Sequence, residues 1–199
     1  MKSIHSTVHV SLGGARAEKH GAARSALLPG SFDPLHEAHI RLAHLAAEML
    51  GRPVAFELSV ANVDKPPLSD VEIERRLAQF AGLAEVWLTR ASRFIEKAAC
   101  FPGSTFVVGA DTAARVVSAR YDDGDTGRRD AALDCLRQAG CSFLVAARAD
   151  AAGQCWRLED LDIPAAWRDL FLGIPETRFR LDLSSTELRR KHGRQHLCL

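Results

Sequence analysis

Residues 25–39 read SALLPGSFDPLHEAH, a segment in which a strand, a turn and a helix follow one another directly. Its first four residues form a short apolar run that ends at Pro29–Gly30, which is typical of a buried strand cut off by a turn. Over residues 37–50, apolar side chains recur at helical spacing, and Gly51 follows as a helix stop. The segment therefore predicts one strand–turn–helix unit.

The same alternation continues along the chain. Further short apolar strands are expected at 54–60, 85–89, 105–108 and 142–146. Helices are expected at about 69–81, 93–99, 111–120, 131–139 and 165–170, with a loop at 121–129, an extended segment at 179–183 and a last helix from about 185. Short strands that alternate with helices form right-handed βαβ units, so the predicted fold class is α/β, a doubly wound parallel sheet of about five strands with helices on both faces.

Composition excludes several classes of protein. The chain has 199 residues, of which 47% are hydrophobic, enough to build a core. A formal net charge of +1 gives no bulk electrostatic case for binding nucleic acid or a membrane surface. No apolar run approaches the ~20 residues that span a bilayer, and no secretory signal precedes the first strand, so a cytoplasmic protein is expected.

Residues 1–24 are expected to be a mobile leader and residues 25–199 a single domain.

Two histidines mark the first turn. His36 and His39 are three residues apart at a helix start, so their rings lie on nearly the same face. Free backbone N–H groups and the positive end of the helix dipole make such a start an anion site. Two less specific interpretations exist: a zinc site, for which no third ligand lies nearby, and a histidine cap beside a surface histidine. The strand–glycine–helix context favours a phosphate site.

A second helix start carries similar chemistry near the end of the chain. Residues 183–190 read LSSTELRR, in which Ser184 and Glu187 have the spacing of a capping box. The capping box explains neither Ser185 nor Thr186, and it does not need Arg189. Hydroxyl groups, free N–H groups and an arginine one turn later form a second phosphate cradle.

These two segments resemble the signatures of a known family. GSFDPLHEAH resembles the H-x-G-H signature of the nucleotidyltransferase superfamily, whose cytidylyltransferase-like fold is Rossmann-like, and LSSTELR is similar to its I-S-S-T-x-x-R signature. Both occur in the family's order, at opposite ends of residues 25–191. The second signature is closest to that of enzymes that adenylylate nicotinamide or nicotinate mononucleotide. One residue departs from the pattern: Ala38 stands where the family has glycine, and its methyl group could crowd a bound nucleotide.

The resemblance implies roles for particular residues. His36, His39 and Arg189 are expected to be catalytic, stabilising charge on the triphosphate in the transition state. Gly109–Ala110–Asp111 resembles the family's G-x-D turn, whose carboxylate holds the ribose of adenosine, although Asp111 could also cap the next helix. The full set expected to bind ATP is Gly30, Ser31, Phe32, His36, His39, Gly109, Asp111, Ser184, Ser185, Thr186 and Arg189.

Three residues are candidates for binding the acceptor, the mononucleotide that would receive AMP from ATP. Lys65, in the loop after the second strand, could contact the acceptor's phosphate or could be an ordinary loop lysine. Trp87 and Phe94 could stack on a pyridine ring, whereas strand aromatics such as Trp87 more often pack in the core.

The expected reaction transfers AMP from ATP to nicotinamide or nicotinate mononucleotide and releases pyrophosphate. Mg²⁺ would be bound mainly by substrate phosphates and water, with no protein metal site. The expected partners are small-molecule nucleotides, without nucleic acid or membrane, and a homo-oligomer or a partner domain is compatible with the sequence. Three alternatives remain open: adenylyl transfer to phosphopantetheine, CTP-dependent transfer to a phosphorylated alcohol, and a nucleotide-binding partner domain without activity.

Overall fold

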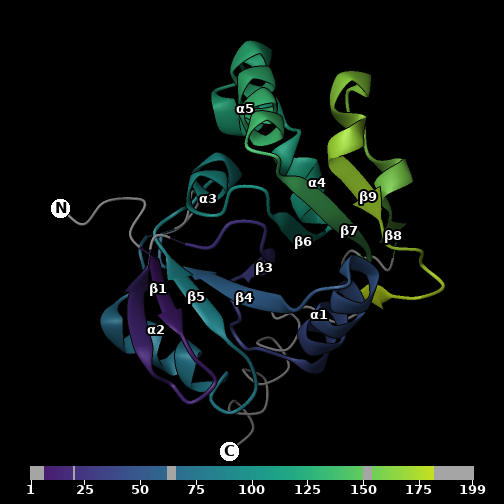
Figure 1. Ribbon diagram of the computed structural model, residues 1–199. Helices are drawn as coiled ribbons and strands as arrows, with labels where there is room; N and C mark the ends of the chain where they lie inside the picture. Colours follow the sequence, from purple (N-terminus) through teal and green to yellow (C-terminus); the bar gives the residue numbers. More distant parts are fainter. Residues whose placement is uncertain (1–6, 20, 62–65, 150–153, 182–199) are drawn as a thin grey trace, which may run out of the picture.

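A computed structural model describes residues 7–19, 21–61, 66–149 and 154–181, and its centre is a parallel sheet (Figure 1). Five mutually parallel strands lie in the order β7-β6-β3-β4-β5. Their bounds are β3 (Ala26–Gly30), β4 (Val54–Ser59), β5 (Val86–Thr89), β6 (Thr105–Gly109) and β7 (Ser142–Ala149). This arrangement confirms the predicted α/β class, and these strands coincide with the five that the apolar runs predict.

Helices cover both faces of the sheet, because successive side chains of each buried strand point to opposite faces. In β3, Leu28 packs with residues of α1 (Glu37–Leu50) and α2 (Asp70–Ala78), whereas its neighbour Leu27 packs with residues of three other helices on the opposite face. Those three helices are α3 (Phe94–Cys100), α4 (Ala110–Val116) and α5 (Thr126–Gln138). The core therefore has two layers, one on each side of the sheet (Figure 1).

Additional strands extend the sheet at both edges. An antiparallel hairpin, β1 (Thr7–Val10) and β2 (Arg16–Lys19), pairs with β5 through β1. At the other edge, β9 (Phe171–Gly173) and β10 (Arg180–Leu181) run parallel to β7, and β8 (Cys155–Trp156) runs antiparallel to it.

The hairpin differs from the mobile leader expected over residues 1–24. It is docked because Val10 enters the core beside α2 and because Gly21 lies against α3, where a Cβ atom would be 1.8 Å from the carbonyl oxygen of Cys100. Only four residues of each strand pair, which is too short a pattern to stand out in a Gly- and Ala-rich segment.

Other boundaries also differ from expectation. α5 begins at Thr126, inside the segment expected to be a loop, because the Asp125 carboxylate accepts hydrogen bonds from the N–H groups of Gly127 and Arg128. Ala165–Leu170 is a 3₁₀ helix, and two further 3₁₀ turns cover Ala119–Asp122 and Leu158–Asp160. The last helix, expected from about residue 185, lies outside the described residues.

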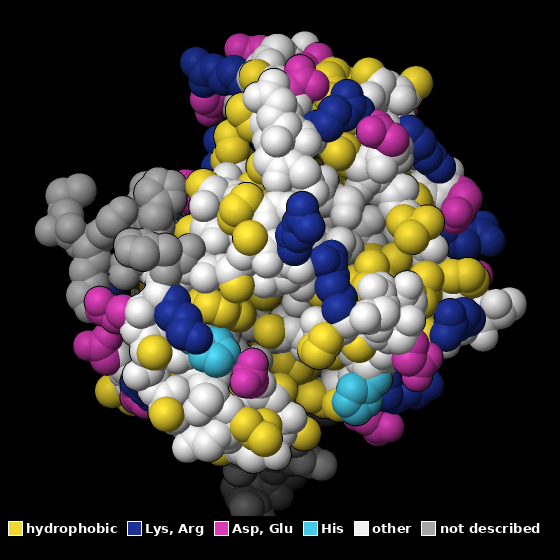
Figure 2. Space-filling model, in the orientation of Figure 1, with side chains coloured by type: hydrophobic (Ala, Val, Ile, Leu, Met, Phe, Trp, Pro, Cys, Tyr) yellow, Lys and Arg dark blue, Asp and Glu magenta, His cyan; other side chains and the backbone are white. Residues whose placement is uncertain are grey.

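The surface agrees with the nearly balanced charge. Acidic and basic side chains are interspersed over the face shown in Figure 2, so no field of a single sign dominates it. Across the described ranges, no helix combines the length and the apolar character that a membrane span requires.

The order of the strands locates the site. The chain runs from β3 through β4 to β5, then crosses back to place β6 on the other side of β3. The gap between β3 and β6 is therefore the point where the strand order reverses, and ligands of doubly wound sheets bind at the carboxyl ends of the strands there.

The packing of Gly21 against α3 yields a stability test. Gly21 has a positive φ of 77°, and the Cβ atom of an alanine would overlap the carbonyl of Cys100. Gly21→Ala should lower the free energy of unfolding by about 2 kcal/mol or more in urea titrations. The matched control is Gly13→Ala, since no atom lies within 4 Å of the added Cβ there. Equal stability of both variants would mean that the hairpin segment is loosely attached.

Candidate functional site

A cavity of about 980 Å³ opens at the carboxyl ends of the central strands. Gly30 of β3, Ser59 of β4 and Gly109 of β6 line it, together with residues of α2, α3, α4 and α5. It lies where the strand order reverses, and its volume is in the range of small-molecule sites. The cavity is therefore the candidate ligand site.

The two histidines of the first turn line this cavity as a stacked pair. Their ring centroids are 3.7 Å apart, with 22° between the ring planes. His36 is the N-cap residue of α1, and its backbone N–H donates to Nδ1 of His39 at 3.3 Å. The ring of Phe32 meets His39 edge-on at 5.1 Å. The helix start thus fixes both rings side by side.

The surroundings keep both imidazoles neutral. Burial is the largest cause that lowers the pKa of His39, to about 3, and the nearby His36 and Arg148 lower it further. Burial and Arg148 likewise lower the pKa of His36. Because Nδ1 of His39 accepts a backbone hydrogen bond, the proton of the neutral ring belongs on Nε2. At neutral pH the pair therefore supplies hydrogen-bond donors without adding positive charge.

The positive charge near the pair comes from Arg148, which the sequence reasoning missed. Arg148 lies near the end of β7 and lines the cavity, with Nη1 3.4 Å from Oδ1 of Asp111. Its position just after the apolar run at 142–146 was the available signal, because parallel sheets collect their chemistry at the carboxyl ends of strands.

Asp111 lies in the first turn of α4 beside Gly109, but it is not the helix cap, because the N-cap residue of α4 is Gly109. A Cβ atom at Gly109 would lie 2.7 Å from Oδ1 of Asp111, so a side chain there would displace the Asp111 carboxylate from its present position. In the described part of the chain, two buried side-chain polar atoms have no hydrogen-bond partner: Oδ1 of Asp111 and Nδ1 of His36. Buried polar atoms are usually paired, and because His36 lines the cavity, its Nδ1 atom is available to a ligand there. Asp111 is not part of the cavity lining, and its Oδ1 atom lies within ion-pair distance of Arg148.

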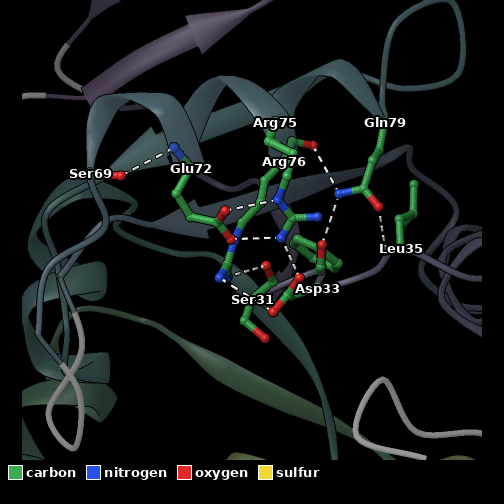
Figure 3. Close-up of polar contacts among 9 residues, drawn as sticks. Ser31, Asp33, Leu35, Ser69, Glu72, Arg75, Arg76 and Gln79 are labelled. Carbon is green, nitrogen blue, oxygen red and sulfur yellow. Dashed lines mark hydrogen bonds and ion pairs between the residues drawn. The ribbon is translucent and has the colours of Figure 1, made fainter. Parts of the chain in front are cut away.

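The loop that carries the histidines is held by α2 (Figure 3). Gln79, the C-cap residue of α2, donates from Nε2 to the carbonyl of Phe32 at 2.9 Å and accepts from the N–H of Leu35 at 2.8 Å. One amide side chain thus fixes the backbone of the loop at both ends of residues 32–35.

Two arginines of α2 complete this hold. Arg76 donates to the carbonyl of Ser31 at 2.7 Å, and Arg75 forms an ion pair with Asp33 (Figure 3). Glu72 accepts hydrogen bonds from Arg75 and Arg76, which lower its pKa to about 2. The carbonyls of Ser31 and Phe32 therefore face α2. The N–H groups of the same trans peptides must point away from α2, which suits a backbone anion site.

Two other expected ATP ligands, Gly30 and Phe32, are held by close packing. A Cβ atom at Gly30 would lie 2.7 Å from the Phe32 ring, so only glycine fits. Phe32 has a φ of 46° and is fully buried against Phe56 and Phe80, although it also lines the cavity. Ala38, in the first turn of α1, is buried in the core and is not part of the cavity lining.

The candidates for the acceptor are placed differently from one another. Phe94 lines the cavity and packs edge-on against Phe106 at 5.3 Å. Trp87 is buried between His9 and Phe101 and is not part of the cavity lining, so its position is that of a core residue. Lys65 lies outside the described residues.

The second predicted phosphate cradle belongs to the end of the chain. Ser184, Ser185, Thr186 and Arg189 all lie outside the described residues. The structure thus brings together the first predicted cradle, Gly109 and Asp111, and adds Arg148 to them.

Comparison with known families gives one match. A family model described as Cytidylyltransferase-like matches residues 27–191, which is most of the chain and includes both signature segments. No curated protein matches the chain.

The lowered pKa of His39 predicts a pH dependence of stability. The unfolded imidazole titrates near 6.5 and the folded one near 3, so between these values the unfolded state binds more protons. Stability should fall as the pH drops from 6.5 toward 3, by at most about 1.4 kcal/mol per pH unit from this group. In urea titrations, His39→Gln should flatten this slope, whereas His44→Gln, at an exposed site on the same helix, should keep it. Equal slopes in both variants would contradict a buried neutral His39.

The two hydrogen bonds between Gln79 and the loop that carries the histidines can be tested by mutation. Gln79→Leu leaves the carbonyl of Phe32 and the N–H of Leu35 without this partner, so it should cost about 1–3 kcal/mol of unfolding free energy. Hydrogen exchange at the Leu35 amide should accelerate as well. Gln138→Leu, at an exposed position on α5, should change stability by less than about 0.5 kcal/mol. Unchanged exchange at Leu35 would show that the loop keeps its shape without Gln79.

Proposed function

The chain belongs to the cytidylyltransferase-like family and is a nucleotidyltransferase, and on that premise we propose that it transfers AMP from ATP to nicotinamide or nicotinate mononucleotide. The products are a pyridine dinucleotide and pyrophosphate. The choice of ATP and of a pyridine acceptor rests on the sequence LSSTELR at 183–189 and on the Gly109–Asp111 turn, which resemble the adenylyltransferase branch.

One observation carries the proposal. Nδ1 of His36 and Oδ1 of Asp111 are buried side-chain atoms without a hydrogen bond, and they belong to residues at the starts of α1 and α4, the helices that follow the neighbouring strands β3 and β6. Oδ1 of Asp111 is also 3.4 Å from Nη1 of Arg148. An imidazole suits a phosphate oxygen, and a carboxylate oxygen suits a ribose hydroxyl. ATP offers both groups, with its triphosphate toward the histidines and its adenosine toward α4.

In the proposed reaction, each residue of the site has a defined role. A phosphate oxygen of the acceptor attacks the α-phosphorus of ATP in line, the bond from that phosphorus to the bridging oxygen breaks, and pyrophosphate leaves with the electron pair. Because the acceptor phosphate is already ionised, no general base is required. The neutral imidazoles of His36 and His39 donate hydrogen bonds to the triphosphate, and Arg148 supplies positive charge. Catalysis then consists mainly of positioning and charge stabilisation.

Mg²⁺ would enter on the triphosphate. In the ranges that the structure describes, no three His, Cys, Asp or Glu side chains lie close enough together to hold a metal ion. Imidazole and guanidinium groups around the cavity fit a metal that is held mainly by phosphate oxygens and water. Such an ion would neutralise charge on the departing pyrophosphate.

The remaining predicted residues complete the proposal. Ser184, Ser185, Thr186 and Arg189 would bind the β- and γ-phosphates, and Lys65 would bind the acceptor phosphate. Phe94 supports an acceptor site on the α3 side of the cavity, because its ring borders the cavity there.

The alternatives lead to different products. Adenylyl transfer to phosphopantetheine and CTP-dependent transfer to a phosphorylated alcohol are distinguished by testing ATP and CTP with each acceptor. A partner domain without activity would bind ATP tightly without turnover, and Ala38→Gly would then restore turnover.

The direct test is a turnover assay with ATP, Mg²⁺ and each pyridine mononucleotide, followed by pyrophosphate release and dinucleotide formation. Wild-type protein should form the dinucleotide. His39→Ala should lower kcat/KM at least ~10²-fold, since it removes a preorganised donor. His44→Ala serves as the control and should retain full activity. Absence of dinucleotide with both acceptors would refute the proposed reaction, and a near-normal rate for His39→Ala would refute the role of the pair.

A further inference from the structure

An ion pair is buried in the core beside the cavity. Glu57 of β4 and Lys97 of α3 are only 1% and 5% exposed, and both line the cavity. The Nζ atom of Lys97 lies 2.8 Å and 2.7 Å from the two carboxylate oxygens of Glu57. No step of the proposed reaction uses either residue.

The pair belongs to a network that fixes the backbone of Ala91, in the loop between β5 and α3. The carbonyl of Ala91 accepts from Nζ of Lys97 at 2.8 Å and from the hydroxyl of Ser59 at 2.8 Å. The N–H of Ala91 donates to the hydroxyl of Thr89 at 3.3 Å, and that hydroxyl donates in turn to Glu57. Both polar groups of the Ala91 backbone are thus tied, through side chains, to Glu57 or Lys97.

The residues directly after Ala91 form one wall of the cavity. Ser92, Arg93 and Phe94 all line it. The carboxylate of Glu96 accepts hydrogen bonds from the N–H groups of Ser92 at 2.6 Å and of Arg93 at 3.0 Å. The position of Ala91 therefore sets where this wall begins.

A contribution to stability does not by itself explain a buried ion pair at this place. Two buried charges lose their hydration, and well-packed apolar residues of similar volume often stabilise a core equally well. The loop that the pair fixes borders the cavity, which indicates that the pair fixes the position of the cavity wall.

We propose that Glu57 and Lys97 are positioning residues for the acceptor half of the reaction. They hold Ala91, and through it the wall formed by residues 92–94, at the distance that a pyridine mononucleotide needs. This inference rests on the proposed function. It assigns the pair to the acceptor because the groups that suit ATP lie at the ends of β3, β6 and β7, whereas the loop at Ala91 follows β5 and adjoins β4.

The decisive variant removes both charges at once, Glu57→Leu/Lys97→Met. Because no uncompensated charge is left in the core, it should fold and unfold at a urea concentration close to that of the wild type. Its KM for the pyridine mononucleotide should rise by about 10-fold or more, since small misplacements at a site have large kinetic effects. Its KM for ATP should stay within about 2-fold. A purely structural pair would not separate the two KM values.

Two further variants control the experiment. Glu57→Gln keeps an oxygen that can accept from Lys97, so its acceptor KM should lie closer to that of the wild type than to that of the double variant. Arg16→Met/Glu74→Gln removes an exposed ion pair with a separation of 2.6 Å, and it should leave both KM values unchanged.

The outcomes separate the two proposals. If the wild type turns over and the folded double variant has wild-type KM values for both substrates, the inference is wrong and the proposed function stands. Equal rises in both KM values would also contradict an acceptor-specific role. If the double variant fails to fold, Thr89→Val decides, because it removes the hydroxyl that links the N–H of Ala91 to Glu57 at a residue that does not line the cavity, and an unchanged acceptor KM would then count against the inference. If the wild type turns over neither pyridine mononucleotide, the proposed function is wrong and this inference falls with it.

Discussion

The site depends on the hydrogen bonds and the ion pair by which α2 fixes the loop between β3 and α1. The Nδ1 atom of His36 has no hydrogen-bond partner, and it would turn toward water if the backbone of the loop could move. The half-buried imidazole pair can therefore meet a ligand only if this backbone is fixed. Gln79 and Arg76 occupy the carbonyls of Phe32 and Ser31, which leaves the opposite side of those peptides for an anion. The same helix borders the cavity, so one element both shapes the loop and forms the wall beside it.

A second network acts on another wall of the cavity. Glu57 and Lys97 fix the loop after β5, as α2 fixes the loop after β3. Loops at strand ends carry the chemistry of doubly wound folds, and rigid neighbours give them defined geometry. Arg148 supplies positive charge close to the two histidines, whose imidazoles are themselves kept neutral by burial. Charge and hydrogen bonding are thus supplied by different residues.

The sequence predicted the parallel core and the pairing of two histidines at the first helix start, because both depend on local patterns. Short apolar runs located the five central strands, and the strand–glycine–helix pattern located His36 and His39. Contacts between distant segments were not predictable in this way. The role of Gln79 depends on a pairing 44 residues away, and that of Lys97 on one 40 residues away. The hairpin at 7–19 was missed because its strands are short, and Trp87 illustrates how a strand aromatic can equally be a core residue.

The most direct measurement is a crystal structure of the full chain with a non-hydrolysable ATP analogue and Mg²⁺. We expect the triphosphate against the rings of His36 and His39 and the guanidinium of Arg148, with the ribose at Asp111 and with Ser185 and Thr186 on the same phosphates. A nucleotide bound elsewhere, or a 184–189 segment on the far side of the molecule from the histidines, would contradict it.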